Sequence, residues 1–184
     1  MVKSLSIWLG MVCLSVSANL WAVTPGEHLS VMEDLTGLEE IRVEAGDVNY
    51  VSAQLGGLEG KVLSIYHLAP RVGIDLLHKP FFDELLKQDF PEGRFQSVTI
   101  ANMDEAAWGT SSLVKAKFED NAKENPGARF MLDEGSKLRD AWGLNKNAAV
   151  VILVDAKGRI FAVKEGEVKP EEVEPLLALI RAQF

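Results

Sequence analysis

Six consecutive apolar residues followed by a tight turn constrain the fold more than any other feature of this sequence. Residues 149–154 carry no polar side chain, which is typical of a strand buried on both faces of a sheet. Residues 155–158, Asp-Ala-Lys-Gly, favour a tight turn, and residues 159–163 return as the antiparallel partner. Because such a strand must be covered on both sides, the hairpin predicts an α/β domain with helices on both faces.

Upstream of the hairpin, short apolar runs alternate with stretches of helical periodicity. The predicted strands are residues 62–67, 95–101 and 129–132. The predicted helices are residues 73–88, 111–123, 136–142 and, after the hairpin, 170–182. Pro80 is expected to kink or restart the first helix, and Ser136 is the expected N-cap of the third. This order predicts a mixed central sheet with parallel central strands and a C-terminal β-hairpin plus helix.

The first 22 residues have the pattern of a signal peptide. Lys3 gives a positive start, and residues 5–16 form an apolar stretch that is shorter than the ~20 residues a membrane span needs. Small residues follow, and cleavage after Ala18 and cleavage after Ala22 both stay open. The pattern predicts export to the periplasm, with no membrane insertion after cleavage.

Residues 23–184 are then expected to form one domain, in which residues 23–56 are an irregular lead-in with short strands. Cys13 is the only cysteine of the sequence, and it lies inside the predicted signal peptide. The exported domain therefore has no thiol, which excludes thiol catalysis, cysteine-metal sites and disulfides.

The charge of the chain limits its partners. The formal net charge is −8, and loss of Lys3, the one charged residue of the predicted signal peptide, leaves −9. This acidic balance argues against nucleic acid or an anionic lipid surface as a partner.

Several local motifs resemble those of thioredoxin-type domains, closest to the redoxins, over residues 57–184. Leu58-Glu59-Gly60-Lys61 leads into the first core strand, and residues 67–75 occupy the loop from that strand to the first helix. Pro80 lies five residues after Asp75, where thioredoxins kink their active-site helix. The resemblance implies a thioredoxin-like fold.

A second set of motifs is individually weak but keeps its order along most of the chain. It consists of Gly60-Lys61-Val62, His67, Arg71, Asn102-Met103-Asp104-Glu105-Ala106, Ser111-Ser112 and residues 149–159. Through these motifs the chain resembles the YtfJ family of bacterial periplasmic proteins. That resemblance implies a thioredoxin-like fold and a Gram-negative envelope location, and it brings no established activity.

Compared with redox-active thioredoxins, the sequence lacks both parts of the redox site. Counting back from Pro80, Val72 and Asp75 occupy the two positions of the C-x-x-C dithiol. Ala149 takes the place of the cis-proline that faces the dithiol, and a non-proline residue favours the trans bond by about 3 kcal/mol. Neither thiol-disulfide oxidoreductase nor peroxidase activity is therefore expected.

Polar residues follow the ends of the predicted parallel strands, where α/β folds place their sites. The candidate binding edge consists of His67, Arg71, Val72, Asp75, Asn102, Asp104, Trp108 and Ala149. Ordinary structural roles remain open for these residues, such as a hydrogen-bonded strand end for His67 and a helix-dipole partner for Asp75. His78 is expected on the surface. The histidines lack metal-ligand spacing, so neither a metal site nor a cofactor is predicted.

The mixed charge of this edge favours a non-catalytic envelope module that binds a protein, a peptide or a small ligand. Three alternatives remain. The first is an envelope enzyme that uses His67 and carboxylates in a cysteine-free cleft. The second is an accessory protein without a small-molecule site, and the third is a redox partner that relies on the thiols of another protein.

Overall fold

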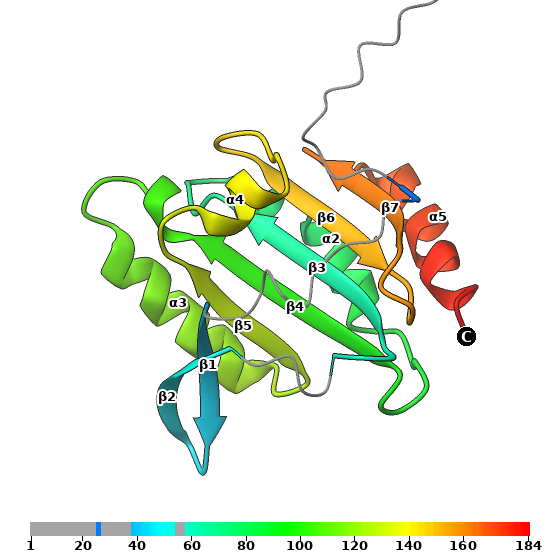
Figure 1. The fold of residues 1–184 in the computed structure, drawn as a ribbon, viewed down its shortest axis with the longest axis horizontal. Helices are drawn as coiled ribbons and strands as arrows, with labels where there is room; N and C mark the ends of the chain where they lie inside the picture. Colours follow the sequence, from blue (N-terminus) through cyan, green and yellow to red (C-terminus); the bar gives the residue numbers. More distant parts are fainter. Residues whose placement is uncertain (1–24, 27–37, 54–57) are drawn as a thin grey trace, which may run out of the picture.

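The computed structural model describes residues 25–26, 38–53 and 58–184. The predicted signal peptide, residues 1–22, lies outside the described residues, as does part of the predicted lead-in. A seven-stranded sheet forms the centre of the described chain (Figure 1). Its strands are β1 (Glu39–Glu44), β2 (Asp47–Ser52), β3 (Val62–Leu68), β4 (Phe95–Asn102), β5 (Ala128–Asp133), β6 (Ala149–Val154) and β7 (Ile160–Glu165).

The order of the strands in the sheet is β2-β1-β5-β4-β3-β6-β7. The pairs β3–β4 and β4–β5 are parallel, whereas β6 is antiparallel to both β3 and β7. The predicted mixed sheet with a C-terminal hairpin is therefore confirmed. The parallel strands β3, β4 and β5 end at one edge, which is where the candidate residues were expected.

The lead-in is more regular than its sequence indicates. Strands β1 and β2 form a continuous antiparallel hairpin, and β1 also pairs antiparallel with β5, for example Glu39 opposite Leu132. The short strands expected within residues 23–56 thus extend the central sheet. Glu40 at this junction is buried, and its carboxylate accepts two 2.7 Å hydrogen bonds from Arg129. That paired charge fixes the hairpin against β5.

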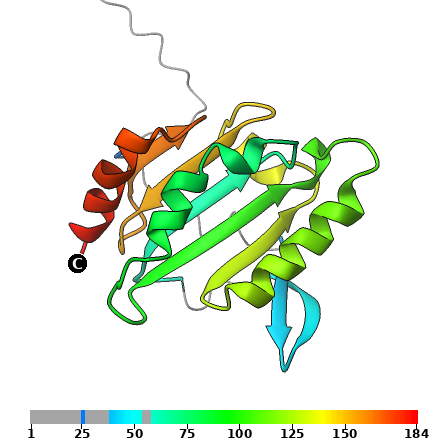
Figure 2. The same cartoon turned by 180° about the vertical axis from the view of Figure 1, so that it is seen from behind.

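Helices cover both faces of the sheet. They are α2 (Lys79–Leu85), α3 (Ser111–Glu124), α4 (Lys137–Ala141) and α5 (Pro170–Arg181), with 3-10 turns η1 (Ile74–Leu76) and η2 (Met103–Glu105). Figure 2 shows α2, α3 and α5 in front of one face, and Figure 1 shows α4 in front of the other. None of the helices in the described part of the chain is long and apolar enough to cross a membrane.

Each face has its own apolar core. Phe81, Phe118 and Leu177 bring α2, α3 and α5 into the larger core, while Leu138 and Trp142 bring α4 into the second. Full burial of side chains of this size contributes roughly 1.5–3 kcal/mol each. The sheet is held between the two layers, as the apolar run of β6 predicts.

Pro80 interrupts the first predicted helix. Residues 73–88 form the 3-10 turn η1 and then α2, which begins at Lys79 and has Pro80 in its first turn. A proline in the first helical turn loses no intrahelical hydrogen bond, so the helix restarts there. The predicted restart is confirmed, and it leaves residues 69–78 as an extended loop and turn above the ends of β3 and β4.

Alternation along β3 decides which side chain faces which layer. Tyr66 belongs to the core under α2 and α3, whereas Leu63 and Ile65 belong to the core under α4. Successive strand residues point to opposite faces, so His67 points to the same face as Leu63 and Ile65, towards α4. The loop after β3 lies on the other face of the sheet, so His67 is separated from it.

Candidate functional site

A groove of about 420 Å³ lies between the loop after β3 and helix α3. Its floor comes from Tyr66, Leu68 and Thr99, on the neighbouring parallel strands β3 and β4. One wall is made by the loop residues Pro70, Arg71, Val72, Gly73 and Asp75. The other wall is made by Ala107, Thr110, Leu113, Val114, Lys117, Phe118 and Asn121. The groove therefore stands above the C-terminal ends of parallel strands, on the face seen in Figure 2.

The loop wall is shaped by a glycine. Gly73 has a φ of 83°, in the left-handed region that side chains with a Cβ rarely adopt. The chain turns there into η1, and the Ile74 N–H donates to the carbonyl of Arg71 at 3.2 Å. This turn presents Val72 to solvent and Asp75 to helix α3.

An ion pair joins the two walls. The ammonium of Lys117 donates to a carboxylate oxygen of Asp75 at 2.6 Å. The hydrogen bond from Lys117 lowers the pKa of Asp75 below its ordinary value, against the opposing effect of partial burial. Asp75 is therefore a carboxylate at neutral pH, and it is already paired.

Tyr66 is the polar group of the groove floor. Its hydroxyl donates to the carbonyl of Ile74 at 3.3 Å, which ties the floor to the loop wall. Burial raises the pKa of Tyr66, and the negative charge of Asp75 raises it further. The phenol stays neutral and acts as a hydrogen-bonding and apolar surface.

Large apolar side chains around the groove are exposed. Val72 and Trp108 are fully exposed, and Leu113 on α3 is 69% exposed. Trp108 directly follows the groove residue Ala107, and Gly109 lets that loop turn towards α3 with a φ of 76°. An apolar surface that surrounds a groove is typical of an interaction site.

A second polar cluster lies under α4, on the opposite face of the sheet. The imidazole Nε2 of His67 is 3.8 Å from the Asp133 carboxylate, and both side chains are buried. Asp133 accepts hydrogen bonds from the backbone N–H groups of Lys137 and Leu138, at 2.9 and 3.0 Å. Burial raises the pKa of Asp133, but nearby His67 and these two donors outweigh burial, so the pKa lies below its ordinary value.

Asp133, and not the side chain of the N-cap residue, caps α4. Ser136 is the N-cap of α4, as predicted, but it has a φ of 52° and its side chain makes no capping hydrogen bond. The Ser136 hydroxyl instead donates to the side-chain oxygen of Asn102 at 3.1 Å. The carboxylate at the end of β5 reaches the free N–H groups of α4, which a serine in left-handed conformation does not.

The cluster under α4 continues to the next loop. Glu105 accepts hydrogen bonds from the Arg139 side chain at 2.9 Å and from the Asn147 backbone at 3.0 Å. Within the described residues, the His67 Nε2 and Asn102 Nδ2 atoms are buried and have no hydrogen-bond partner. These contacts hold α4 and its flanking loops on the sheet.

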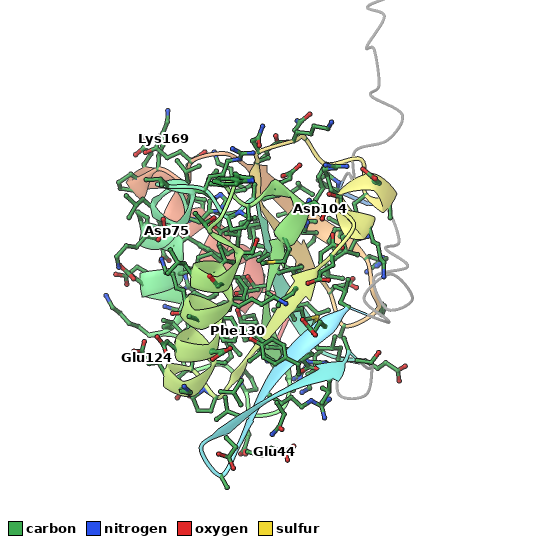
Figure 3. The ribbon with its side chains drawn as sticks, turned by 90° about the vertical axis from the view of Figure 1, so that its left-hand side faces the viewer. Glu44, Asp75, Asp104, Glu124, Phe130 and Lys169 are labelled. Carbon is green, nitrogen blue, oxygen red and sulfur yellow. The ribbon has the colours of Figure 1, made fainter. Side chains whose placement is uncertain are left out.

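The predicted edge residues divide between these two places. Arg71, Val72 and Asp75 line the groove, and Trp108 lies beside it. His67, Asn102 and Asp104 lie on the α4 side. Figure 3 shows the separation, with Asp75 on the side of α3 and Asp104 on the side of α4. Ala149 is buried opposite Leu68, and its peptide bond to Ala148 is trans.

Two further placements differ from the sequence interpretation. His78, expected on the surface, is fully buried and contacts the Tyr66 ring edge-on at a centroid distance of 5.0 Å. Burial lowers the pKa of His78 to about 4. Lys117 was not predicted as a site residue. The helical spacing of Thr110, Leu113, Lys117 and Asn121 is the sequence signal for the face of α3 that lines the groove.

Comparison with known proteins shows to which protein family the chain belongs. A family model described as "Bacterial protein of unknown function (YtfJ_HI0045)" matches residues 28–183, which is most of the sequence. The chain belongs to the YtfJ family. An uncharacterized protein of Haemophilus influenzae is 28% identical over 178 residues, covering 94% of this chain and 95% of that protein. The uncharacterized protein YtfJ of Escherichia coli K12 is 27% identical over 147 residues, covering 80% of each chain.

Solved structures show that this YtfJ-family chain has the thioredoxin-like fold. A thioredoxin-like superfamily protein matches with a TM-score of 0.55 and 18% identity, covering 81% of this chain and 96% of its own. A thiol-disulfide isomerase from Corynebacterium glutamicum matches with a TM-score of 0.51 and 18% identity, covering 77% and 94%. The predicted fold and family resemblance are both confirmed.

The YtfJ-family chain carries this fold without a dithiol. Its only cysteine, Cys13, lies outside the described domain. The described residues also contain no group of histidine, cysteine, aspartate and glutamate side chains arranged to hold a metal ion.

Proposed function

We propose that this protein is a non-catalytic binding module of the bacterial cell envelope, and that it binds an apolar peptide segment of a partner in the groove beside α3. The observation that carries the proposal is the groove itself. It has largely apolar walls, an internally paired Asp75–Lys117 ion pair, and exposed apolar side chains around it.

The exposed residues support a protein or peptide partner. Val72, Leu113 and Trp108 extend the apolar surface beyond the groove, and solvent exposure of such large side chains gains nothing for the isolated domain. Burial of an aromatic anchor and its neighbours is the usual source of binding energy in an interface. We therefore assign Trp108 and Leu113 to the contact surface and the groove to a side chain of the partner.

The side chains that could serve in acid–base catalysis are poorly suited to it, which favours a binding protein over an enzyme. His67 is buried on the α4 side of the sheet, away from the groove. Asp75 is paired with Lys117 and has a lowered pKa, which makes it a weak base. The Tyr66 phenol is held neutral by burial.

The envelope location rests on the predicted signal peptide, residues 1–22, with Lys3 followed by a short apolar stretch. A domain without cysteine has no thiol that the oxidising conditions of that compartment could convert to a disulfide. The acidic net charge also suits a protein partner better than a polyanion.

A photo-crosslinking experiment tests the proposal. A photoreactive phenylalanine analogue replaces Leu113 in the groove wall, and in a matched variant it replaces Leu86 at the end of α2. Leu86 is 67% exposed, close to the 69% of Leu113, and it does not line the groove. After irradiation of intact cells, mass spectrometry identifies the crosslinked peptides.

We expect the Leu113 variant to crosslink one partner repeatedly through a single peptide of that partner, and the Leu86 variant to give no such product. Equal products from both positions, or none from Leu113, would contradict binding in the groove.

A further inference from the structure

We propose that the groove recognises the carboxyl terminus of a peptide chain whose last residue is large and apolar, with Arg71 binding the terminal carboxylate. This inference rests on the proposed function, because it specifies which part of the partner enters the groove.

The charges around the groove point to an anionic group. Three charged side chains line it, namely Arg71, Asp75 and Lys117. Asp75 and Lys117 neutralise each other at 2.6 Å. Arg71 is exposed, and its guanidinium forms no hydrogen bond or ion pair with any part of the chain that the structure describes. The groove therefore has one unpaired positive charge, and a guanidinium binds a carboxylate through two parallel hydrogen bonds.

The size and walls of the groove point to an apolar side chain next to that anion. Its volume of about 420 Å³ is near the lower end of the roughly 300–1,000 Å³ typical of ligand pockets. Leu68, Val114 and Phe118 line it together with the Tyr66 ring. This space fits one or two apolar side chains, and it is too small for a folded element.

A chain terminus satisfies both features at once. In an extended peptide, neighbouring side chains point to opposite sides, so an internal acidic residue and the apolar residue beside it diverge. The last residue of a chain carries its carboxylate and its side chain on the same Cα atom. It can place the side chain over Leu68 and Phe118 while its carboxylate meets Arg71 at the rim.

The Asp75–Lys117 pair makes the proposal testable in two directions. Both side chains are about half exposed, at 49% for Asp75 and 61% for Lys117, and such pairs contribute only about 0–1 kcal/mol. Replacement of Asp75 by asparagine removes the negative charge and frees Lys117 to attract an anion. Replacement of Arg71 by glutamine removes the unpaired cation. The first change is therefore expected to strengthen carboxylate binding, and the second to weaken it.

The test is an NMR titration with short peptides. It uses the isotope-labelled protein in the form that cells produce after export. The main probe is acetyl-Ala-Ala-Ala-Phe with a free carboxylate, and its C-terminal amide is the matched control. Acetyl-Ala-Ala-Ala-Ser tests the apolar side chain, and acetyl-Ala-Asp-Phe-Ala-amide tests an internal carboxylate. The protein variants are Arg71→Gln, Asp75→Asn and, as a surface control in the turn after α2, Lys87→Ala.

We expect the free-acid phenylalanine peptide to bind about 10-fold more tightly than its amide, as a charge-assisted hydrogen bond of about 1.5 kcal/mol implies. Addition of this peptide is expected to change the chemical shifts of the backbone amides of the groove residues. Arg71→Gln is expected to reduce the preference to about 2-fold or less, Asp75→Asn to increase it, and Lys87→Ala to leave it unchanged.

Equal affinity for the free acid and the amide, tighter binding of the internal-carboxylate peptide, or an undiminished preference in Arg71→Gln would overturn the inference. So would the absence of binding by all four peptides. If crosslinking through Leu113 still identifies a partner in that case, the proposed function stands and only the terminal carboxylate is wrong. If Leu113 gives no crosslink either, both proposals fail.

Discussion

Lys117 on α3 donates a 2.6 Å hydrogen bond to Asp75, which lies in the loop wall on the other side of the groove. The pair spans the groove and links its two walls through side chains that are about half exposed. The sequence count from Pro80 predicts that this position corresponds to the second cysteine of redox-active thioredoxins, and here it carries a paired carboxylate. The consequence is electrostatic, because Asp75 stays charged while its partner neutralises it.

Loss of Lys117 is expected to change the ionisation of Asp75 more than the stability of the fold. In Lys117→Ala the pKa of Asp75 is expected to rise towards its ordinary value, because the hydrogen bond and the positive charge that lower it are gone. The free energy of unfolding is expected to change by less than about 1 kcal/mol, since the pair is exposed. Carboxylate NMR during a pH titration measures the first effect, and urea denaturation measures the second. Lys87→Ala is the control. An unchanged Asp75 titration in Lys117→Ala would show that the ion pair does not form in solution.

His78 is expected to make the fold sensitive to acid. Its pKa is about 4 in the folded chain, against an ordinary value of 6.5, so the unfolded chain binds more protons between these two pH values. The stability that His78 contributes as a neutral side chain is complete above pH 6.5 and is lost as the pH falls towards 4, by up to about 3 kcal/mol.

The measurement is urea denaturation between pH 4.5 and pH 8, compared for the unchanged protein and His78→Leu. The variant is expected to be less stable at pH 8, because it loses the ring contact with Tyr66, but its stability should fall less between pH 7 and pH 4.5. Parallel pH dependence of the two proteins would mean that His78 does not resist protonation in the folded state.

Asp133 is expected to be the most sensitive polar residue under α4. It is fully buried, and its carboxylate holds the two backbone N–H groups that begin the helix. Asp133→Ala leaves these two donors without their acceptor and removes the carboxylate beside the buried His67, so we expect a loss of about 2–3 kcal/mol of stability. Glu134→Ala is the matched control, since its side chain is 63% exposed, and it should cost less than about 1 kcal/mol. Thermal denaturation checks both. Equal effects in the two variants would contradict the capping role.

The strands and helices from β3 to α5 could be predicted because their signals are local. An apolar run such as β6, or helical spacing such as that of α3, is contained within one element. The pairing of β1 with β5 could not be predicted. Glu39 and Leu132 are distant in the sequence, and no local pattern around either residue indicates that they pair. Register between remote strands depends on packing of the whole sheet, which no short segment encodes.

Prediction of the candidate site from the sequence was limited for a different reason. Strand-end reasoning groups Arg71 and Asp75, which both line the groove, with His67, which alternation along β3 directs to the opposite face. That separation could have been read from the sequence by counting from Tyr66. The burial of His78 could not, because its polar ring and the adjacent Lys79 resemble a surface turn until the packing of Tyr66 against it is known.

Export is expected to remove the N-terminal segment, which lies outside the described residues. The short apolar stretch after Lys3 and the small residues that follow predict cleavage between residues 18 and 23. Intact-mass measurement of the protein from an envelope fraction should show a chain that begins at Asn19 or Val23 and contains no cysteine. A mature mass that still includes Met1 would mean that the segment is kept as an anchor.

The two groove positions Val72 and Asp75 are expected to accept a disulfide. They are three residues apart, on either side of the turn at Gly73 that leads into η1. Because the turn at Val72 and Gly73 folds the chain back into η1, we expect the two Cα atoms to lie near the ~5.5 Å that disulfides prefer. In Val72→Cys with Asp75→Cys, we therefore expect an intramolecular disulfide under mild oxidant, seen as a loss of two protons by mass and of both free thiols. The start of η1 should stabilise the thiolates, so the bond should also be readily reduced.

The unchanged protein, without these sulfurs, should show no insulin reductase or thiol peroxidase activity. Val72→Cys with Lys79→Cys is the matched control, because Lys79 lies beyond η1 in α2 and should not pair as readily. Two free thiols in a folded Val72–Asp75 double variant would mean that these positions do not correspond to the dithiol of redox-active relatives.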